Sequence, residues 1–171
     1  METFGAHHCK MSRPLKASIK EFFDLSDADV DCLESIKTEP TELLGGKSYV
    51  EVQISQSEGW AKPFFGIDIF GRLIVRRLQK AIDLNPDQGL FVCSDSGFTE
   101  ESWPTVEFFG KKNTLLVKLG REGKTFAGDS RGYIDLPGVA TCWLQNDDKG
   151  SYLQAVDDLV GSFLAGEPCP F

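Results

Sequence analysis

The stretch from Asp68 to Asn85 carries the clearest periodic pattern in this chain of 171 residues. Its apolar side chains recur at helical spacing and therefore fall within about a third of the helix circumference. They are Phe70, Ile74, Leu78, Ala81 and Ile82. The Asn85-Pro86 pair ends the pattern, because a proline cannot continue a helix. The sequence therefore predicts a central amphipathic helix over 68–84, which has to bury one face.

Capping residues predict three further helices. Ser12, followed by a proline two positions later, begins a helix that runs to about residue 25. Ser26, with Asp29 three residues on, caps a second helix that ends before Pro40. Ser151 caps a closing helix that runs to about residue 164.

Short stretches rich in β-branched and aromatic residues predict strands, and glycine-containing turns between several of them favour antiparallel pairing. The predicted strands are 49–54, 89–94, 105–109, 114–119, 124–127 and 139–144. We therefore expect an α+β fold. Its antiparallel sheet has about five or six strands, accompanied by two N-terminal helices, the central amphipathic helix and a C-terminal helix.

The length favours one domain with one main core, and 13 Phe supply an aromatic core. We expect a flexible tail over 1–11, a single α+β domain over 12–166 and a second tail over 167–171. The domain has a helical N-terminal part, 12–44, and a part with the sheet and its helices, 47–166.

The chain shows no apolar run near the roughly 20 residues of a membrane span, and its first residues lack the pattern of a secretory signal. Its five cysteines are scattered and include no C-x-x-C pair, which favours reduced thiols. These features predict a cytoplasmic protein that does not associate with membranes.

The formal net charge is -8, and the acidic residues concentrate in the N-terminal third. An acidic surface repels phosphate backbones, so we expect no nucleic-acid binding. It favours a basic protein partner instead, because complementary charge speeds association. The candidate partner-binding carboxylates are Asp27, Asp29, Asp31, Glu34, Asp147 and Asp148.

Arg72, Arg76 and Lys80 form a basic stripe opposite the apolar face of the central helix, with Arg77 at its border. Three interpretations remain open. The stripe is a solvated face, it pairs with acidic residues such as those at 157 and 158, or it recognises an acidic partner or a phosphate group.

The only histidines are His7 and His8, in the expected tail. A Ser-His-Asp or Cys-His arrangement needs an imidazole beside the nucleophile, so the sequence predicts no catalytic residue of these classes. Ser130, in a Gly-Asp-Ser stretch without a later histidine, is read as part of a turn. His7, His8 and Cys9 are metal-ligand types, yet adjacent tail residues rarely complete a site, and we expect no metal and no cofactor.

The loop over 93–101 follows a predicted strand and gathers Cys93, Asp95 and Ser96. Loops after strands often carry function, which makes these three residues a possible site. The alternative is a polar loop in which Gly97 supplies a positive φ.

Residues 14–50 resemble the opening of Crp/Fnr-type transcriptional regulators, in which a short helix, a Leu-Ser-Asp turn and a second helix precede a glycine-led first strand. The carrying segment is PLKASIKEFFDLSDADVDCLESIKTEPTELLGGKSYV. The resemblance implies a regulatory sensor domain. The central helix departs from that family's jelly roll, so no ligand residues are carried over.

Three hypotheses on function follow. The first is a non-enzymatic domain that binds a basic protein, such as an immunity protein or an antitoxin-like inhibitor. The second is a degenerate regulatory sensor domain related to Crp/Fnr regulators. The third is a histidine-independent enzyme that uses the 93–101 loop. The sequence leans away from an enzyme and leaves the oligomeric state open.

Overall fold

A computed structural model describes residues 4–126 and 132–167 of the chain, which is divided between Ser96 and Gly97 into two compact units. The described residues are α+β, as predicted, but the antiparallel sheet of five or six strands is wrong. In its place each unit has one small sheet of two parallel strands. Compact units of this kind do not by themselves define domains, so the single domain over 12–166 stays a prediction.

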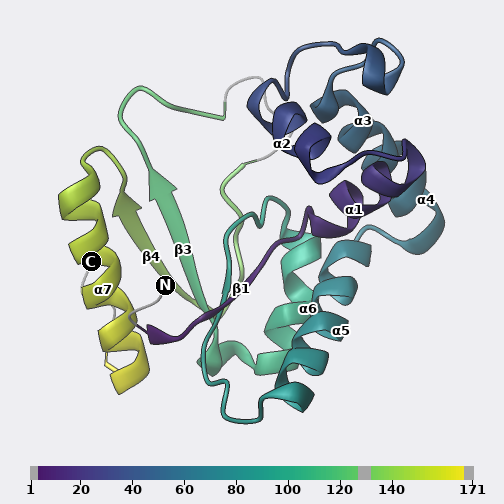
Figure 1. The fold of residues 1–171 in the computed structure, drawn as a ribbon. Helices are drawn as coiled ribbons and strands as arrows, with labels where there is room; N and C mark the ends of the chain where they lie inside the picture. Colours follow the sequence, from purple (N-terminus) through teal and green to yellow (C-terminus); the bar gives the residue numbers. More distant parts are fainter. Residues whose placement is uncertain (1–3, 127–131, 168–171) are drawn as a thin grey trace. The chain divides into compact units, whose positions relative to one another are not determined.

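The first unit is mostly helical (Figure 1). Its helices are α1 (Arg13–Phe22), α2 (Asp27–Ser35), α3 (Tyr49–Gln56), α4 (Lys62–Phe65) and α5 (Ile69–Leu84), with a 3-10 turn η2 (Glu42–Leu44) and a π-helical segment η3 (Ser57–Ala61). The predicted central helix is confirmed as α5, which buries Phe70, Ile74 and Leu78. The predicted cap of α2 is also confirmed: Ser26 and Asp29 form a capping box.

The predicted strand over 49–54 is wrong, because these residues form α3. Ser48 accepts a hydrogen bond from the backbone of Glu51, and the Glu51 carboxylate accepts one from the Ser48 backbone. Tyr49 is fully buried and Val52, one helical turn on, packs against the same core.

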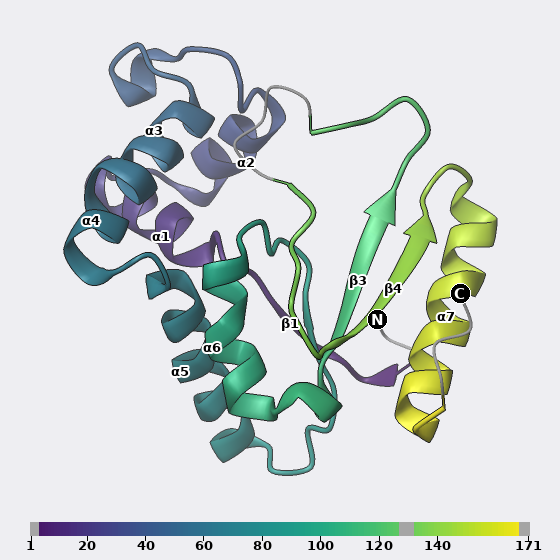
Figure 2. The same ribbon diagram turned by 180° about the vertical axis from the view of Figure 1, so that it is seen from behind.

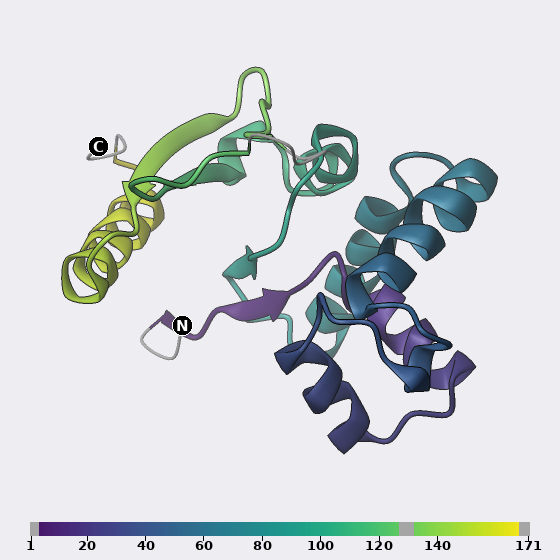
Figure 3. The same cartoon turned by 90° about the horizontal axis from the view of Figure 1, so that it is seen from above.

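The core of the first unit joins α1, α2, η2 and α3. Its buried members are Ile19, Leu25, Leu33, Leu44 and Tyr49. The unit's sheet pairs β1 (His7–Cys9) with β2 (Phe91–Cys93) in parallel. Residues 7–9, placed by the sequence in a flexible tail, thus lie beside a strand more than eighty positions along the chain (Figure 3).

The second unit contains α6 (Thr99–Phe109), the 3-10 turn η4 (Lys111–Asn113), β3 (Leu115–Gly120), β4 (Ala140–Gln145) and α7 (Lys149–Ala165). β3 and β4 run in parallel, with α7 beside them (Figure 2). Cys142 and Leu144 of β4 are buried with Leu159 of α7. Residues on α6 and in the segment before β4 form a second small core, made of Val106, Leu136 and Val139.

Two further predicted strands are wrong. Residues 105–109 belong to α6, which continues through Pro104, and residues 124–126 form no strand. Residue 127 and the Ser130 turn lie outside the described residues. The strands at 114–119 and 139–144 are confirmed as β3 and β4, although they pair with each other in parallel.

Candidate interaction surface

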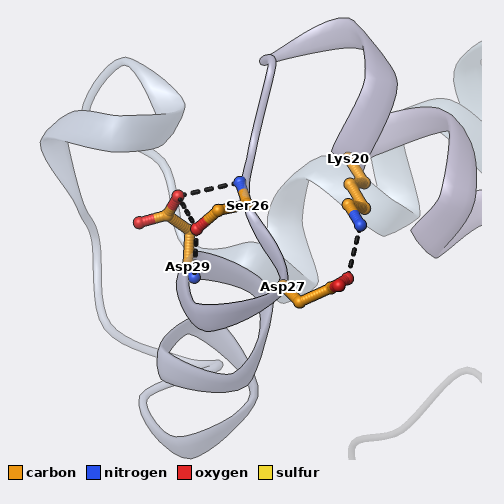
Figure 4. A network of polar contacts seen from close by, with 4 residues as sticks. All are labelled: Lys20, Ser26, Asp27 and Asp29. Atoms are coloured by element: carbon orange, nitrogen blue, oxygen red, sulfur yellow. Dashed lines mark hydrogen bonds and ion pairs between the residues drawn. The ribbon is translucent and has the colours of Figure 1, made fainter.

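The carboxylates of α2 serve local structure first (Figure 4). Asp27 forms an ion pair with Lys20 of α1, and Glu34 forms one with Lys16 of the same helix. Asp29 accepts hydrogen bonds from the Ser26 backbone at 2.9 Å and from the Ser26 hydroxyl at 2.6 Å. These hydrogen bonds, first of all the one from the Ser26 side chain, lower the pKa of Asp29.

Asp31 differs from its neighbours on α2. Its side chain is exposed, and no described residue forms a hydrogen bond or ion pair with it. Of the four predicted carboxylates on this helix, Asp31 is therefore the one left available to a partner.

The acidic pair before α7 also has local roles. Asp147 accepts a hydrogen bond from the backbone of Glu122 at 2.7 Å. Asp148 is the N-cap of α7 and accepts one from the Ser151 backbone at 2.9 Å, so the cap lies three residues earlier than the Ser151 predicted. Both side chains remain exposed.

The 93–101 loop brings its three predicted residues together. The Asp95 carboxylate lies 3.7 Å from the Cys93 sulfur, and the Ser96 hydroxyl lies 3.6 Å from the same sulfur. Asp95 also accepts hydrogen bonds from the backbones of Met11 and Ser12, at 2.6 and 3.0 Å. The carboxylate thus holds the loop to the residues before α1, which is a structural role.

His8 and Cys9 of β1 lie near this loop. His8 shares a 2.7 Å hydrogen bond with Ser94, and Cys9 lies opposite Cys93 in the sheet. Within the described ranges no three of the His, Cys, Asp and Glu side chains are placed to hold a metal ion. Cys9, Cys32 and Cys93 are free thiols, whereas Cys142 is disulfide-bonded, so the expectation of five reduced cysteines is wrong.

The basic stripe lies on the outer face of α5. Arg72 forms an ion pair with Asp68 at 3.2 Å and donates a hydrogen bond to the Phe65 carbonyl. Arg76 and Lys80 are exposed, and among the described residues neither has an ion pair. Arg77 points inward: one of its guanidinium nitrogens is buried without a hydrogen-bond partner in the described structure, and burial lowers the pKa of this side chain.

Sequence reasoning missed an exposed aromatic patch on η3, α4 and the turn before α5. The aromatic patch consists of Trp60, Phe64 and Phe65 together with the aliphatic Ile67, and their exposed fractions are 50, 73, 50 and 61 %. The Trp60 and Phe65 rings meet edge to face with centroids 5.4 Å apart, and Phe64 lies 6.5 Å from Phe65. The signal was available, because residues 60 and 64 are one helical turn apart in Gly-Trp-Ala-Lys-Pro-Phe-Phe-Gly.

Buried neighbours fix the backbone that carries the aromatic patch. Ser57 and Ala61 are buried at the two ends of η3. Lys62, whose side chain is 10 % exposed, pairs with Glu58 at 2.8 Å. The Arg72 hydrogen bond to the Phe65 carbonyl closes the turn after α4. The aromatic side chains are therefore presented to solvent from an anchored segment.

Comparison with known protein families, curated proteins and solved structures gives no match to this chain. No helix of the described ranges has the length and apolar character needed to span a bilayer.

Proposed function

We propose that this chain acts by binding another protein, and that the aromatic patch together with the basic stripe of α5 forms the contact surface. The observation that carries the proposal is the group of Trp60, Phe64 and Phe65 rings, which are half or more exposed while the Phe65 ring lies beside each of the other two. Contiguous exposed aromatic groups on soluble proteins mark interaction sites, and tryptophan is enriched among the residues that dominate binding energy.

The fixed backbone indicates that the exposed aromatic side chains serve partner binding. A partner that meets side chains already held in place loses less conformational freedom on binding. The η3 segment and the Phe65–Arg72 hydrogen bond provide this order. Pro63 contributes as well, because its ring restricts φ at the start of α4.

The adjoining charges indicate the partner's chemistry. Arg72 links the aromatic patch to the basic stripe, and Arg76 and Lys80 continue it at helical spacing along α5. An acidic segment with apolar side chains would complement both parts of this surface. This partner differs from the basic one predicted from the charge of α2, where Lys16 and Lys20 compensate two of the carboxylates.

The other hypotheses remain predictions. A basic partner at α2 would contact Asp31, the carboxylate without a described ion pair. The regulatory sensor domain and the enzyme at the 93–101 loop gain no support from the contacts of the described residues, and the cytoplasmic location stays a prediction.

The test compares two exposed phenylalanines of the same unit. Phe64 is 73 % exposed in the aromatic patch, and Phe22 is 78 % exposed on α1. Tagged wild-type chain, Phe64→Ser and Phe22→Ser are used to capture proteins from source-cell lysate, which are quantified by mass spectrometry. We expect a stoichiometric partner whose recovery falls about tenfold with Phe64→Ser and is unchanged with Phe22→Ser.

Two checks make the result specific. Equal urea midpoints for the three proteins exclude unfolding as the cause. Arg76→Glu should also lower the recovery of the partner relative to wild type, most strongly at low salt, because it reverses a charge of the basic stripe. Equal recovery of every captured protein by wild type and Phe64→Ser would refute the proposed surface.

A further inference from the structure

The two strands of the first unit bring two free thiols face to face. β1 and β2 pair in register, and Cys9 is the residue opposite Cys93. Neighbouring strands lie about 4.8 Å apart, and paired residues of parallel strands point to the same face of a sheet. Both cysteines are free, and the two paired strands lie near the first and the last residues of the unit in the sequence.

This spacing suits a covalent bond between the sulfurs. Disulfides join residues whose Cα atoms are about 4.4 to 6.8 Å apart, a range that includes the strand spacing. The strands are already held together by the Asp95 hydrogen bonds to Met11 and Ser12 and by the His7 backbone hydrogen bond to the Leu90 carbonyl at 2.8 Å. Formation of the disulfide then requires rotation of the two cysteine side chains and no change of strand register.

We propose that Cys9 and Cys93 form a reversible disulfide in which a low-molecular-weight disulfide such as oxidised glutathione is the oxidant. The bond is a redox modification site that ties the N-terminal segment to the end of β2. It goes beyond the proposed partner binding and does not depend on it.

The reaction proceeds by two exchanges. The Cys93 thiolate attacks one sulfur of oxidised glutathione, the glutathione S–S bond breaks, and one glutathione thiolate leaves. The Cys9 thiolate then attacks the Cys93 sulfur of the mixed disulfide, and the second glutathione thiolate leaves. The two protons lost by the cysteines end on the two glutathione molecules. Two protein thiols are oxidised and one glutathione disulfide is reduced.

Exposure decides which thiol reacts first. Cys9 is 8 % exposed, whereas Cys93 is half-buried and hence more accessible to a tripeptide. Burial raises the pKa of both thiols, and the proximity of Cys93 contributes to the raised pKa of Cys9. Exchange at this pair is therefore slower than at the exposed Cys32.

The experiment equilibrates the full chain in glutathione buffers of graded redox ratio. Samples are quenched with acid, alkylated and digested without reduction, and mass spectrometry quantifies the linked peptides. We expect the Cys9–Cys93 peptide pair to increase as the buffer becomes more oxidising, in the wild type and equally in Cys32→Ser. Dithiothreitol should abolish the pair.

Single variants test the order of the steps and guard against misfolding. Cys9→Ser should accumulate glutathione on Cys93, because the second exchange has lost its nucleophile. Cys93→Ser should leave Cys9 largely unmodified under the same conditions. Circular dichroism spectra that match the wild type confirm that both variants are folded. Persistence of unlinked Cys9 and Cys93 at every ratio, or linkage of either one to Cys32 instead, would overturn the proposal.

Discussion

The Asp95 carboxylate accepts a hydrogen bond from the backbone N–H of Met11 at 2.6 Å, across 84 positions of the sequence. Its second oxygen accepts from the backbone and the hydroxyl of Ser12. Ser12 precedes α1, so one half-buried side chain at the end of β2 fixes both the chain entering a helix and the loop leaving a strand.

Replacing Asp95 should therefore destabilise the first unit. We expect Asp95→Ala to lower the free energy of unfolding by about 2 kcal/mol, because three donors lose a charged acceptor at once. Urea denaturation followed by circular dichroism measures the change. Asp87→Ala, at an exposed position before β2, is the matched control and should change stability by less than about 0.5 kcal/mol. Similar losses in both variants would contradict the structural role of Asp95.

The Tyr49 hydroxyl is buried and has no hydrogen-bond partner among the described residues. Tyr49→Phe removes this polar group and keeps the ring that fills the core. We expect the free energy of unfolding to rise by about 1 kcal/mol, since an unsatisfied buried hydroxyl is costly. Urea unfolding at neutral pH measures the gain.

Tyr133→Phe provides the opposite case. The Tyr133 hydroxyl donates to the Leu119 carbonyl at 3.1 Å, so its removal should leave stability unchanged or lower it by up to about 1 kcal/mol. If Tyr49→Phe destabilises the chain as much as Tyr133→Phe, the Tyr49 hydroxyl is satisfied in solution and our reasoning about it fails.

Strong local signals account for the parts of the fold that the sequence predicts. The α2 capping box and the apolar stripe of α5 are set by neighbours within a few residues, and both are confirmed. The segment 49–54 shows the limit of periodicity, because its alternation competes with a Ser48–Glu51 capping box. That Ser-x-x-Glu signature was readable at the start of the segment and favours the helix.

Pairing partners were beyond sequence reasoning. The glycine turn after β3 suggested a hairpin, but β3 pairs with β4, nearly twenty residues later, and runs parallel to it. Such pairings depend on contacts between distant residues, which period and turn composition do not report. The parallel pair β1 and β2, which places Cys9 opposite Cys93, was missed for the same reason.

The candidate site was predicted only in part. The basic stripe and the exposed carboxylates follow from charge and helical spacing. That Lys16 and Lys20 would reach α2 depends on how α1 packs, which spacing alone does not give. The aromatic patch was missed because the many phenylalanines were assigned to a core, although Phe22, Phe64 and Phe65 are exposed.

Helix caps should make stability fall in acid. Hydrogen bonds from the Ser48 backbone and the Ser151 backbone lower the pKa of Glu51 and Asp148, as those from Ser26 lower that of Asp29. A lowered folded-state pKa means that the stabilisation is present above the ordinary pKa near 4 and is lost as the pH falls through the lower folded value. The urea concentration at the midpoint of unfolding should therefore decrease as the pH falls below about 4.

Asp29→Asn isolates one of these caps. The difference in stability between wild type and this variant should narrow as the pH falls from 5 to 2, since protonation of Asp29 removes the advantage of the charged carboxylate. Asp31→Asn, on the same helix but outside the capping box, is the control. A difference for Asp29→Asn that stays constant over this pH range would show that its charge does not contribute to the cap.

Asp31 decides whether α2 also contacts a basic partner. Reversing Asp29 or Glu34 would disturb a cap or an ion pair, so loss of binding in those variants is ambiguous. Asp31→Lys leaves both contacts in place and should change stability by less than about 0.5 kcal/mol. Glu39→Lys changes the net charge equally at another exposed position of the same unit.

If α2 binds a basic protein, that protein should elute from Asp31→Lys at lower salt than from wild type or Glu39→Lys. The reason is that Asp31→Lys reverses a charge within the contact, whereas Glu39→Lys reverses one outside it. Identical salt elution from all three proteins would exclude α2 as the contact and leave the aromatic patch, whose complementary partner is acidic.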